Sequence, residues 1–179
     1  MAPATGPAIG DYTRVVDATL FLVEIGRALE QTRLDAILIG NAAAALQGAP
    51  VTTVDFDFMF RKTARNMAKL KALAAAIHGS ILRPYYPAAD LYRVMRDDGL
   101  QIDFMATIHG IRSFEGLRAR SEVIEIGDTS VRVAALADII RSKEAARRPR
   151  DRAVLDVLKA ALEERTRQEK ETRRPRTRE

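Results

Sequence analysis

The alternation of hydrophobic and polar positions divides the first half of this chain into helices and strands. Apolar residues recur at helical spacing over roughly 12–32 and again over 63–79, so each segment is expected to form an amphipathic helix. Between them, "AILIG" (36–40) is wholly apolar and "TVDFDFMF" (53–60) is nearly so, which is typical of buried strands. The Ala-rich run between these strands predicts a short helix that stops at Pro50.

The second half of the chain predicts two pairs of strands. Leu91–Arg96 and Leu100–Ala106 flank the sequence Asp97-Asp98-Gly99, and an Asp-Gly step between alternating runs is typical of a hairpin turn. A second pair of strands is expected within 121–136, with its turn at Gly127-Asp128.

Helical periodicity returns at Leu136, breaks near Pro149 and resumes from about Arg150 into the charged C-terminus. The sequence shows no internal repeat and no second core. We therefore expect a single α/β domain over residues 1–164, with a mixed β-sheet flanked by helices and a helical C-terminal section. Residues 1–11 are expected to be flexible.

The amino-acid composition is that of a single folded domain without a membrane helix. The chain has 179 residues, of which 47% are hydrophobic, enough for one core. No apolar run approaches the roughly 20 residues of a membrane helix, and the N-terminus lacks the features of a signal peptide. Membrane association is therefore not expected, and the cytoplasm is the expected compartment. Cysteine is absent, which excludes disulfides and thiolate metal ligands.

Positive charge gathers at the C-terminus. The net charge is +5, and residues 165–179 hold six Arg and one Lys against three Glu, which leaves the first 164 residues near +1. This segment is interpreted as a basic tail, either disordered or a frayed helix end. A basic arm that contacts RNA phosphates is the alternative.

Two aspartates interrupt the apolar strand at 53–60. Asp55 and Asp57 share one face of that strand, while Phe56 and Phe58 take the other. Neighbouring carboxylates repel each other, and burial adds to the cost. A solvent-exposed face, basic partners or a divalent metal ion would each account for them.

A third aspartate favours the metal. Asp103 lies between Ile102 and Phe104 on another apolar strand, and pairing beside 53–60 would bring three carboxylates to one face. Oxygen ligands suit Mg²⁺ or Mn²⁺. Gly40-Asn41 precedes these acids at a strand–helix junction, where free amides can bind phosphate; capping of the helix by Asn41 is the alternative. Together these features are equipment for nucleotidyl transfer.

The order of these residues resembles the polymerase-β-like nucleotidyltransferase superfamily. Gly40-Asn41 is followed by thirteen residues and then by Asp55-Phe56-Asp57-Phe58, with Asp103 further on. The segment "AALADIIRSKEAARRPRDRAVLDVL" is similar to the one that closes the abortive-infection-type nucleotidyltransferases of toxin–antitoxin systems. The resemblance covers about 35–160. Asn41, Val51 and Val154 depart from the family pattern, which has Gly or Ser, Arg and Asp at these places.

The resemblance implies a role for each matching residue. Asp55, Asp57 and Asp103 would bind two Mg²⁺ or Mn²⁺ ions, and Asp103 would also help remove the acceptor's proton. Gly40 and Asn41 would cradle the triphosphate of an NTP. Lys143 would neutralise phosphate charge, and Asp151 would match an Asp of the closing motif. Residue chemistry alone leaves open that Lys143 is merely solvated and that Asp151 caps a helix.

The implied activity is transfer of NMP from an NTP, such as ATP, to an acceptor hydroxyl with release of pyrophosphate. The resemblance suggests a toxin that modifies RNA, at the tRNA 3′ end, or a protein such as a partner antitoxin. A small-molecule nucleotidyltransferase of the antibiotic-modifying kind is the first alternative. A nucleotide-binding protein that has lost catalysis is the second.

Overall fold

The computed structural model describes residues 13–53, 55–82 and 90–172, so the segment expected to be flexible at 1–11 lies outside the described residues. Six helices and seven strands alternate along the described part of the chain. The helices are α1 (Thr13–Thr32), α2 (Gly40–Leu46), α3 (Ala64–Ala76), α4 (Phe114–Arg120), α5 (Leu136–Ala146) and α6 (Pro149–Thr172). The strands are β1 (Ala36–Ile39), β2 (Asp55–Phe60), β3 (Ser80–Leu82), β4 (Leu91–Met95), β5 (Gln101–Met105), β6 (Glu122–Ile126) and β7 (Thr129–Val133).

The strands form one mixed sheet in the order β3-β4-β5-β2-β1-β7-β6. Both expected hairpins are present, since β4 pairs with β5 and β6 pairs with β7, each antiparallel. β2 lies at the centre, antiparallel to β1 and parallel to β5. The expected pairing of the Asp103 strand beside the Asp55–Asp57 strand is therefore confirmed.

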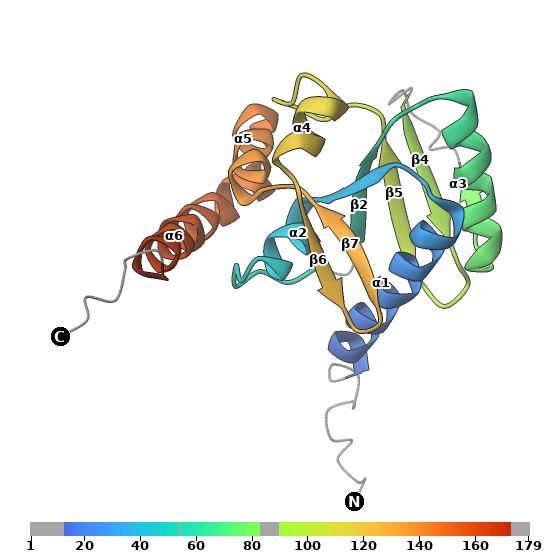
Figure 1. Ribbon diagram of the computed structural model, residues 1–179, viewed down its shortest axis with the longest axis horizontal. Coiled ribbons are helices and arrows are strands. Elements are labelled where there is room, and N and C mark those ends of the chain that lie inside the picture. The colour runs from blue at the N-terminus through green and yellow to red at the C-terminus, as the bar shows by residue number, and fades with distance from the viewer. Residues whose placement is uncertain (1–12, 54, 83–89, 173–179) are drawn as a thin grey trace, which may run out of the picture.

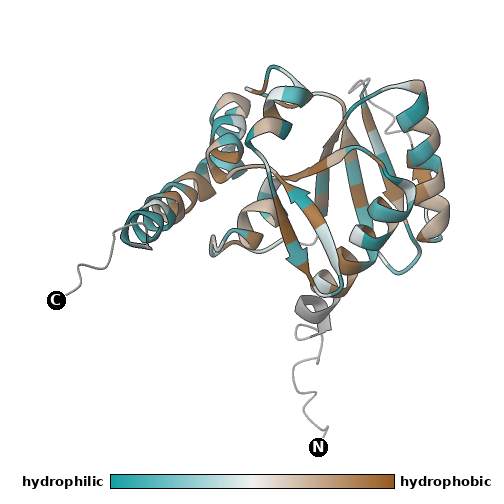
Figure 2. Cartoon of the chain, viewed as in Figure 1, coloured by the Kyte–Doolittle hydropathy of each residue, from teal (hydrophilic) through white to brown (hydrophobic). Residues whose placement is uncertain are grey.

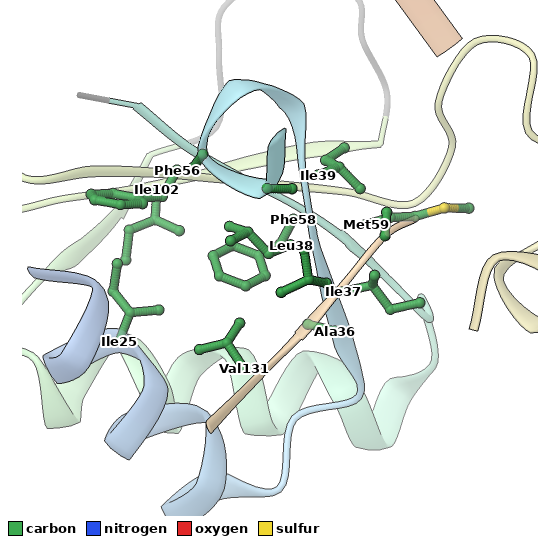
Figure 3. Packing of buried hydrophobic residues seen from close by; sticks show 14 of the residues in the cluster. Ile25, Ala36, Ile37, Leu38, Ile39, Phe56, Phe58, Met59, Ile102 and Val131 are labelled. Atoms are coloured by element: carbon green, nitrogen blue, oxygen red, sulfur yellow. The ribbon is translucent and has the colours of Figure 1, made fainter. Parts of the chain in front are cut away.

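One face of the central strands forms the main core. Phe58 stacks on Phe104 with ring centroids 5.3 Å apart, and Phe60 meets Phe104 edge-on at 6.1 Å. Figure 3 shows Phe58 gathered with Leu38 of β1 and Ile25 of α1. These side chains are almost completely buried, and each such residue stabilises the fold by roughly 1.5–3 kcal/mol.

Helices complete the layers around the sheet (Figure 1). α1 packs on β7 and against α3, whereas α2 packs on β1 and β2 and contacts α5. α5 in turn packs against α6, which runs outward from the body of the molecule. In Figure 2 the outer half of α6 is mostly hydrophilic, as its sequence predicts. The mixed sheet flanked by helices and the helical C-terminal section confirm the expected fold class.

Some elements of the structure differ from those predicted from the sequence. α4 and the short strand β3 were not predicted, because seven and three residues are too few to show a period. α6 continues to Thr172, so residues 165–172 of the expected basic tail are helical, while 173–179 lie outside the described residues. The division of the chain at residue 164 remains a prediction. Within the described ranges, no helix combines the length and the hydropathy needed to span a membrane.

Candidate active site

The predicted acids line a cleft of about 830 Å³. Strand pairing brings them there: Asp57 of β2 is the register partner of Asp103 of β5, and Asp103 is the partner of Arg93 of β4. Side chains in register share a face of a sheet. Asp55 lies two residues before Asp57 and therefore on the same face, opposite the phenylalanine core.

Asp57 is the most perturbed acid of the cleft. Burial, followed by repulsion from Asp103 and Asp55, raises the pKa of the Asp57 carboxyl from 3.8 to about 6. Lys143 and Arg150 act in the opposite direction. Asp55 is exposed at the beginning of β2. β2 thus presents an accessible carboxylate, Asp55, and a mostly buried one, Asp57, whose ionised form is disfavoured by its surroundings.

Asp103 has a cationic partner. The Arg93 guanidinium donates from Nε and Nη2 to the two Asp103 carboxylate oxygens, each at 2.8 Å. Asp103 is buried, whereas a third of the Arg93 side chain is exposed at the cleft wall. Of the three explanations for buried acids, basic partners therefore apply to Asp103.

Gly40 is required by the packing around Asp57. Its φ of +70° is a left-handed conformation, and a Cβ atom there would lie 2.8 Å from Asp57 Oδ2. Asn41 follows within the helix, and its Oδ1 is buried and accepts no hydrogen bond from the described residues. The helix begins at Gly40 with Ile39 as its N-cap, so the capping interpretation of Asn41 is wrong.

Lys143 and Asp151 form a pair between helices. Lys143 Nζ of α5 lies 3.1 Å from Asp151 Oδ1 in the first turn of α6, and both side chains are nearly buried at the cleft wall. Lys143 is thus not merely solvated. Asp151 is placed where the helix dipole favours an acid, and its contact with Lys143 also fixes the α5–α6 corner.

Several cleft residues were not predicted as site residues. Arg93 could have been found from the hairpin alone, because a turn centred on Asp98 places positions 93 and 103 opposite each other. Arg148 and Arg150 belong to a basic stretch of the sequence, and nothing in that stretch marks them as cleft residues. Asp138 of α5 is 3% exposed and receives hydrogen bonds from Arg120 of α4 and from Arg141. Only the folded chain brings these groups to the cleft.

The donor set partly fits a divalent cation. Asp55 and Asp57 offer oxygen ligands on one face, as Mg²⁺ and Mn²⁺ prefer, and a cation would favour the ionised form of Asp57. Among the residues that the structure describes, no three His, Cys, Asp or Glu side chains are arranged to hold one ion. The third carboxylate of the face, Asp103, faces Arg93 instead.

No family model and no curated protein matches the sequence. Among solved structures, the antibiotic-resistance factor ANT(2'')-Ia is similar at a TM-score of 0.57 and 13% identity, over 83% of this chain and 84% of that one. The lincosamide antibiotic adenylyltransferase LnuA, with lincomycin bound, matches at 0.57 and 12% identity, over 80% and 96%.

A candidate nucleotidyltransferase of Thermotoga maritima matches at a TM-score of 0.57 and 16% identity, over 88% of this chain and 99% of that one. Each of these structures is aligned over at least four-fifths of both chains. The identities are low, and the likeness is one of fold. This chain has the nucleotidyltransferase fold.

Proposed function

We propose that the protein is a metal-dependent nucleotidyltransferase. The observation that carries this proposal is the convergence of Asp55, Asp57 and Asp103 on one sheet face, in a cleft of a nucleotidyltransferase fold. In the proposed reaction an acceptor hydroxyl oxygen attacks the α-phosphorus of an NTP. The bond to the β-phosphate oxygen breaks, pyrophosphate leaves, and the hydroxyl proton passes to a carboxylate.

The acids of β2 and β5 would prepare the acceptor and hold the cations. Asp55 and Asp57 would bind Mg²⁺ or Mn²⁺, and Asp103 would join them and receive the proton, as the resemblance implies. A bound divalent cation would offset triphosphate charge and lower the pKa of the attacking hydroxyl. The raised pKa of Asp57 supports this assignment, because a bound cation would offset the burial and the repulsion from Asp103 and Asp55 that disfavour its ionised form.

The start of α2, next to Asp57, and the α5–α6 corner would bind the triphosphate. Gly40 allows close approach of the backbone there, and the unsatisfied Asn41 Oδ1 next to it is free to accept a ligand's hydrogen bond. Lys143 supplies positive charge that Asp151 holds in place. Arg148 and Arg150 also line the cleft, and neither forms an ion pair within residues 13–53, 55–82 and 90–172.

An RNA acceptor is supported by the α5–α6 corner. Arg147, Arg148, Arg150 and Arg152 are all exposed there, and such a cluster suits a phosphodiester backbone. The tRNA 3′ end, a protein acceptor, a partner antitoxin and a toxin role rest on the family resemblance alone. We include these acceptors, the antitoxin partner and the toxin role in the proposal because of that resemblance.

A small-molecule acceptor is the second candidate. Among the described residues, six aspartates line the cleft against four Lys and Arg residues, and this excess of acids suits a cationic acceptor. The aspartates are Asp55, Asp57, Asp90, Asp103, Asp138 and Asp151; the cations are Arg93, Lys143, Arg148 and Arg150. Two proteins of the same fold are named for antibiotic resistance or antibiotic adenylylation.

Incubation with Mg²⁺ and each α-³²P-labelled NTP, with total tRNA as acceptor, tests the proposal. We expect label on RNA with the wild type and with Asp97→Asn, an exposed turn residue, and none with Asp55→Asn or Asp57→Asn. Label on protein would move the acceptor to protein. Pyrophosphate release only with an aminoglycoside or lincosamide would select the second candidate. Nucleotide binding without any transfer would contradict both and leave a nucleotide-binding protein.

A further inference from the structure

Of the three aspartates on this sheet face, Asp103 is the one that forms an ion pair within the described part of the chain. Both of its oxygens accept hydrogen bonds from Arg93, in the two-pronged geometry that makes Arg–carboxylate pairs strong. Asp57 stands next to Asp103 in register on the other side. Asp103 therefore lies between a permanent cation and the acid pair Asp55–Asp57.

This position creates a competition. An ion held by Asp55 and Asp57 gains Asp103 as a third ligand only if Asp103 gives up one or both hydrogen bonds to Arg93. Arg93 lies on a strand, and the pairing of its backbone with Asp103 keeps the two residues side by side, so release of Asp103 depends on rotation of the Arg93 side chain. Its side chain is one-third exposed at the cleft wall, which leaves room for rotation.

We infer that Arg93 is a positioning residue that competes with the divalent cation for Asp103, binding the carboxylate while the cleft holds no cation and releasing it when one enters. The inference rests on the proposed function for the existence of the cation site. It goes further in assigning Arg93, a residue outside the family pattern quoted above, the control of how many carboxylates the cation receives.

Without a cation, the pair limits repulsion on the face. Arg93 offsets the charge of Asp103, so the net charge of Asp55, Asp57, Asp103 and Arg93 is −2 rather than −3 when all are ionised. With a cation, Asp103 shifts toward the ion, and Arg93 presents its donors to the cleft. The cost of breaking the pair is then part of every binding event, which keeps cation affinity below what three free carboxylates would give.

Mn²⁺ binding to the full chain without nucleotide tests the inference. Electron paramagnetic resonance of free Mn²⁺ at pH 7.5 gives the dissociation constant for the wild type, Arg93→Gln, Asp103→Asn and the double variant. Arg93→Gln should bind Mn²⁺ about tenfold more tightly or better, since two charge-assisted hydrogen bonds no longer need to be broken. Arg93→Lys keeps the positive charge but cannot donate to both carboxylate oxygens at once. Its Mn²⁺ dissociation constant should therefore lie between those of Arg93→Gln and the wild type.

The double variant separates competition from a general charge effect. If Arg93 acts through Asp103, Arg93→Gln has no effect on Mn²⁺ affinity in the Asp103→Asn background. Equal tightening in both backgrounds, or no tightening in either, would overturn the inference while leaving the cation site intact. Absence of Mn²⁺ binding to the wild type would overturn the site together with the inference. Circular dichroism of each variant establishes that it is folded.

Discussion

At the residue scale, Asp57 carries a buried carboxylate that lowers the stability of the fold when it is ionised. Its pKa of about 6 in the folded chain exceeds the ordinary 3.8 because burial and two neighbouring acids oppose its charge. The folded state therefore holds the Asp57 proton more tightly than the unfolded state does. Between about pH 4 and pH 6 the unfolded state loses this proton first, so stability falls as the pH rises through this window.

Asp57→Asn should remove that penalty. The two pKa values correspond to about 3 kcal/mol of unfolding free energy above pH 6 and to almost none below pH 4. We expect the variant to be more stable than the wild type at pH 7.5 and equally stable at pH 3.5, as measured by urea unfolding without divalent ions. Asp97→Asn is the exposed control. An equal gain at both pH values would show that the effect is not electrostatic.

Gly40 and Gly48 provide a matched pair of glycine substitutions. Both have positive φ, +70° and +87°, but a Cβ at Gly40 would meet Asp57 Oδ2 at 2.8 Å and one at Gly48 would meet nothing within 4 Å. Gly48→Ala should cost about 1 kcal/mol for the left-handed backbone alone. Gly40→Ala should cost more and should also weaken nucleotidyl transfer, because Asp57 must move. Thermal unfolding measures the loss of stability, and the transfer assay measures the loss of activity. Equal effects of the two substitutions would contradict the claim that Gly40 is required by its contact with Asp57.

At the element scale, the corner between α5 and α6 is held by the Lys143–Asp151 pair. The two side chains are 13% and 10% exposed, so removing one leaves a nearly buried charge without a partner. A second pair, Lys159–Glu144, joins the same two helices, but its side chains are each about half exposed. The two pairs differ chiefly in burial.

Lys143→Met should therefore destabilise the fold by about 3–5 kcal/mol, whereas Lys159→Met should cost less than about 1 kcal/mol. Adding Asp151→Leu to Lys143→Met should restore most of the loss, because no charge then stays buried. Chemical denaturation of the three variants and the wild type tests this. If Lys143→Met proved no more harmful than Lys159→Met, the pair would not hold the corner, and Lys143 would be left with its proposed role at the phosphates.

At the scale of the whole molecule, α6 is fastened to the sheet by Arg165. Its guanidinium donates to both oxygens of Glu122 on β6, at 2.8 Å each, and to Gln47 Oε1 after α2. The Gln47 amide also donates to the Ala134 carbonyl and accepts from the Leu136 amide. This cluster joins α2, the start of α5 and α6, three helices around the cleft.

Arg165→Ala should lower the unfolding free energy by about 1–2 kcal/mol, since partly exposed charged hydrogen bonds are lost. Arg167→Ala, whose partner Glu164 is on the same helix and exposed, should change it by less than about 0.5 kcal/mol. Calorimetry of both variants provides the comparison.

A chain that ends at residue 164 should lose at least as much unfolding free energy as Arg165→Ala, because it lacks Arg165 altogether. Unchanged stability would support the predicted domain boundary at that residue.

The sequence by itself determined the longer elements and the shared strand face of Asp55 and Asp57. Periodicity set the long helices, and turn chemistry set both hairpins, because these signals are local. The family resemblance carried by Gly40, Asp55, Asp57 and Asp103 implied the nucleotidyltransferase fold, which the structural comparisons bear out. The period of two along β2 placed Asp55 and Asp57 on one face without any knowledge of their surroundings.

Only the tertiary structure decided which charges meet. The Arg93–Asp103 pair alone follows from its hairpin. Lys143 faces Asp151 because α6 packs back against α5, and Arg165 faces Glu122 because a helix and a strand far apart in sequence pack side by side. Burial, which raises the pKa of Asp57, likewise depends on the whole fold. The strength of an interaction between charges depends on distance and on exclusion of water, and neither is written in the order of residues along the chain.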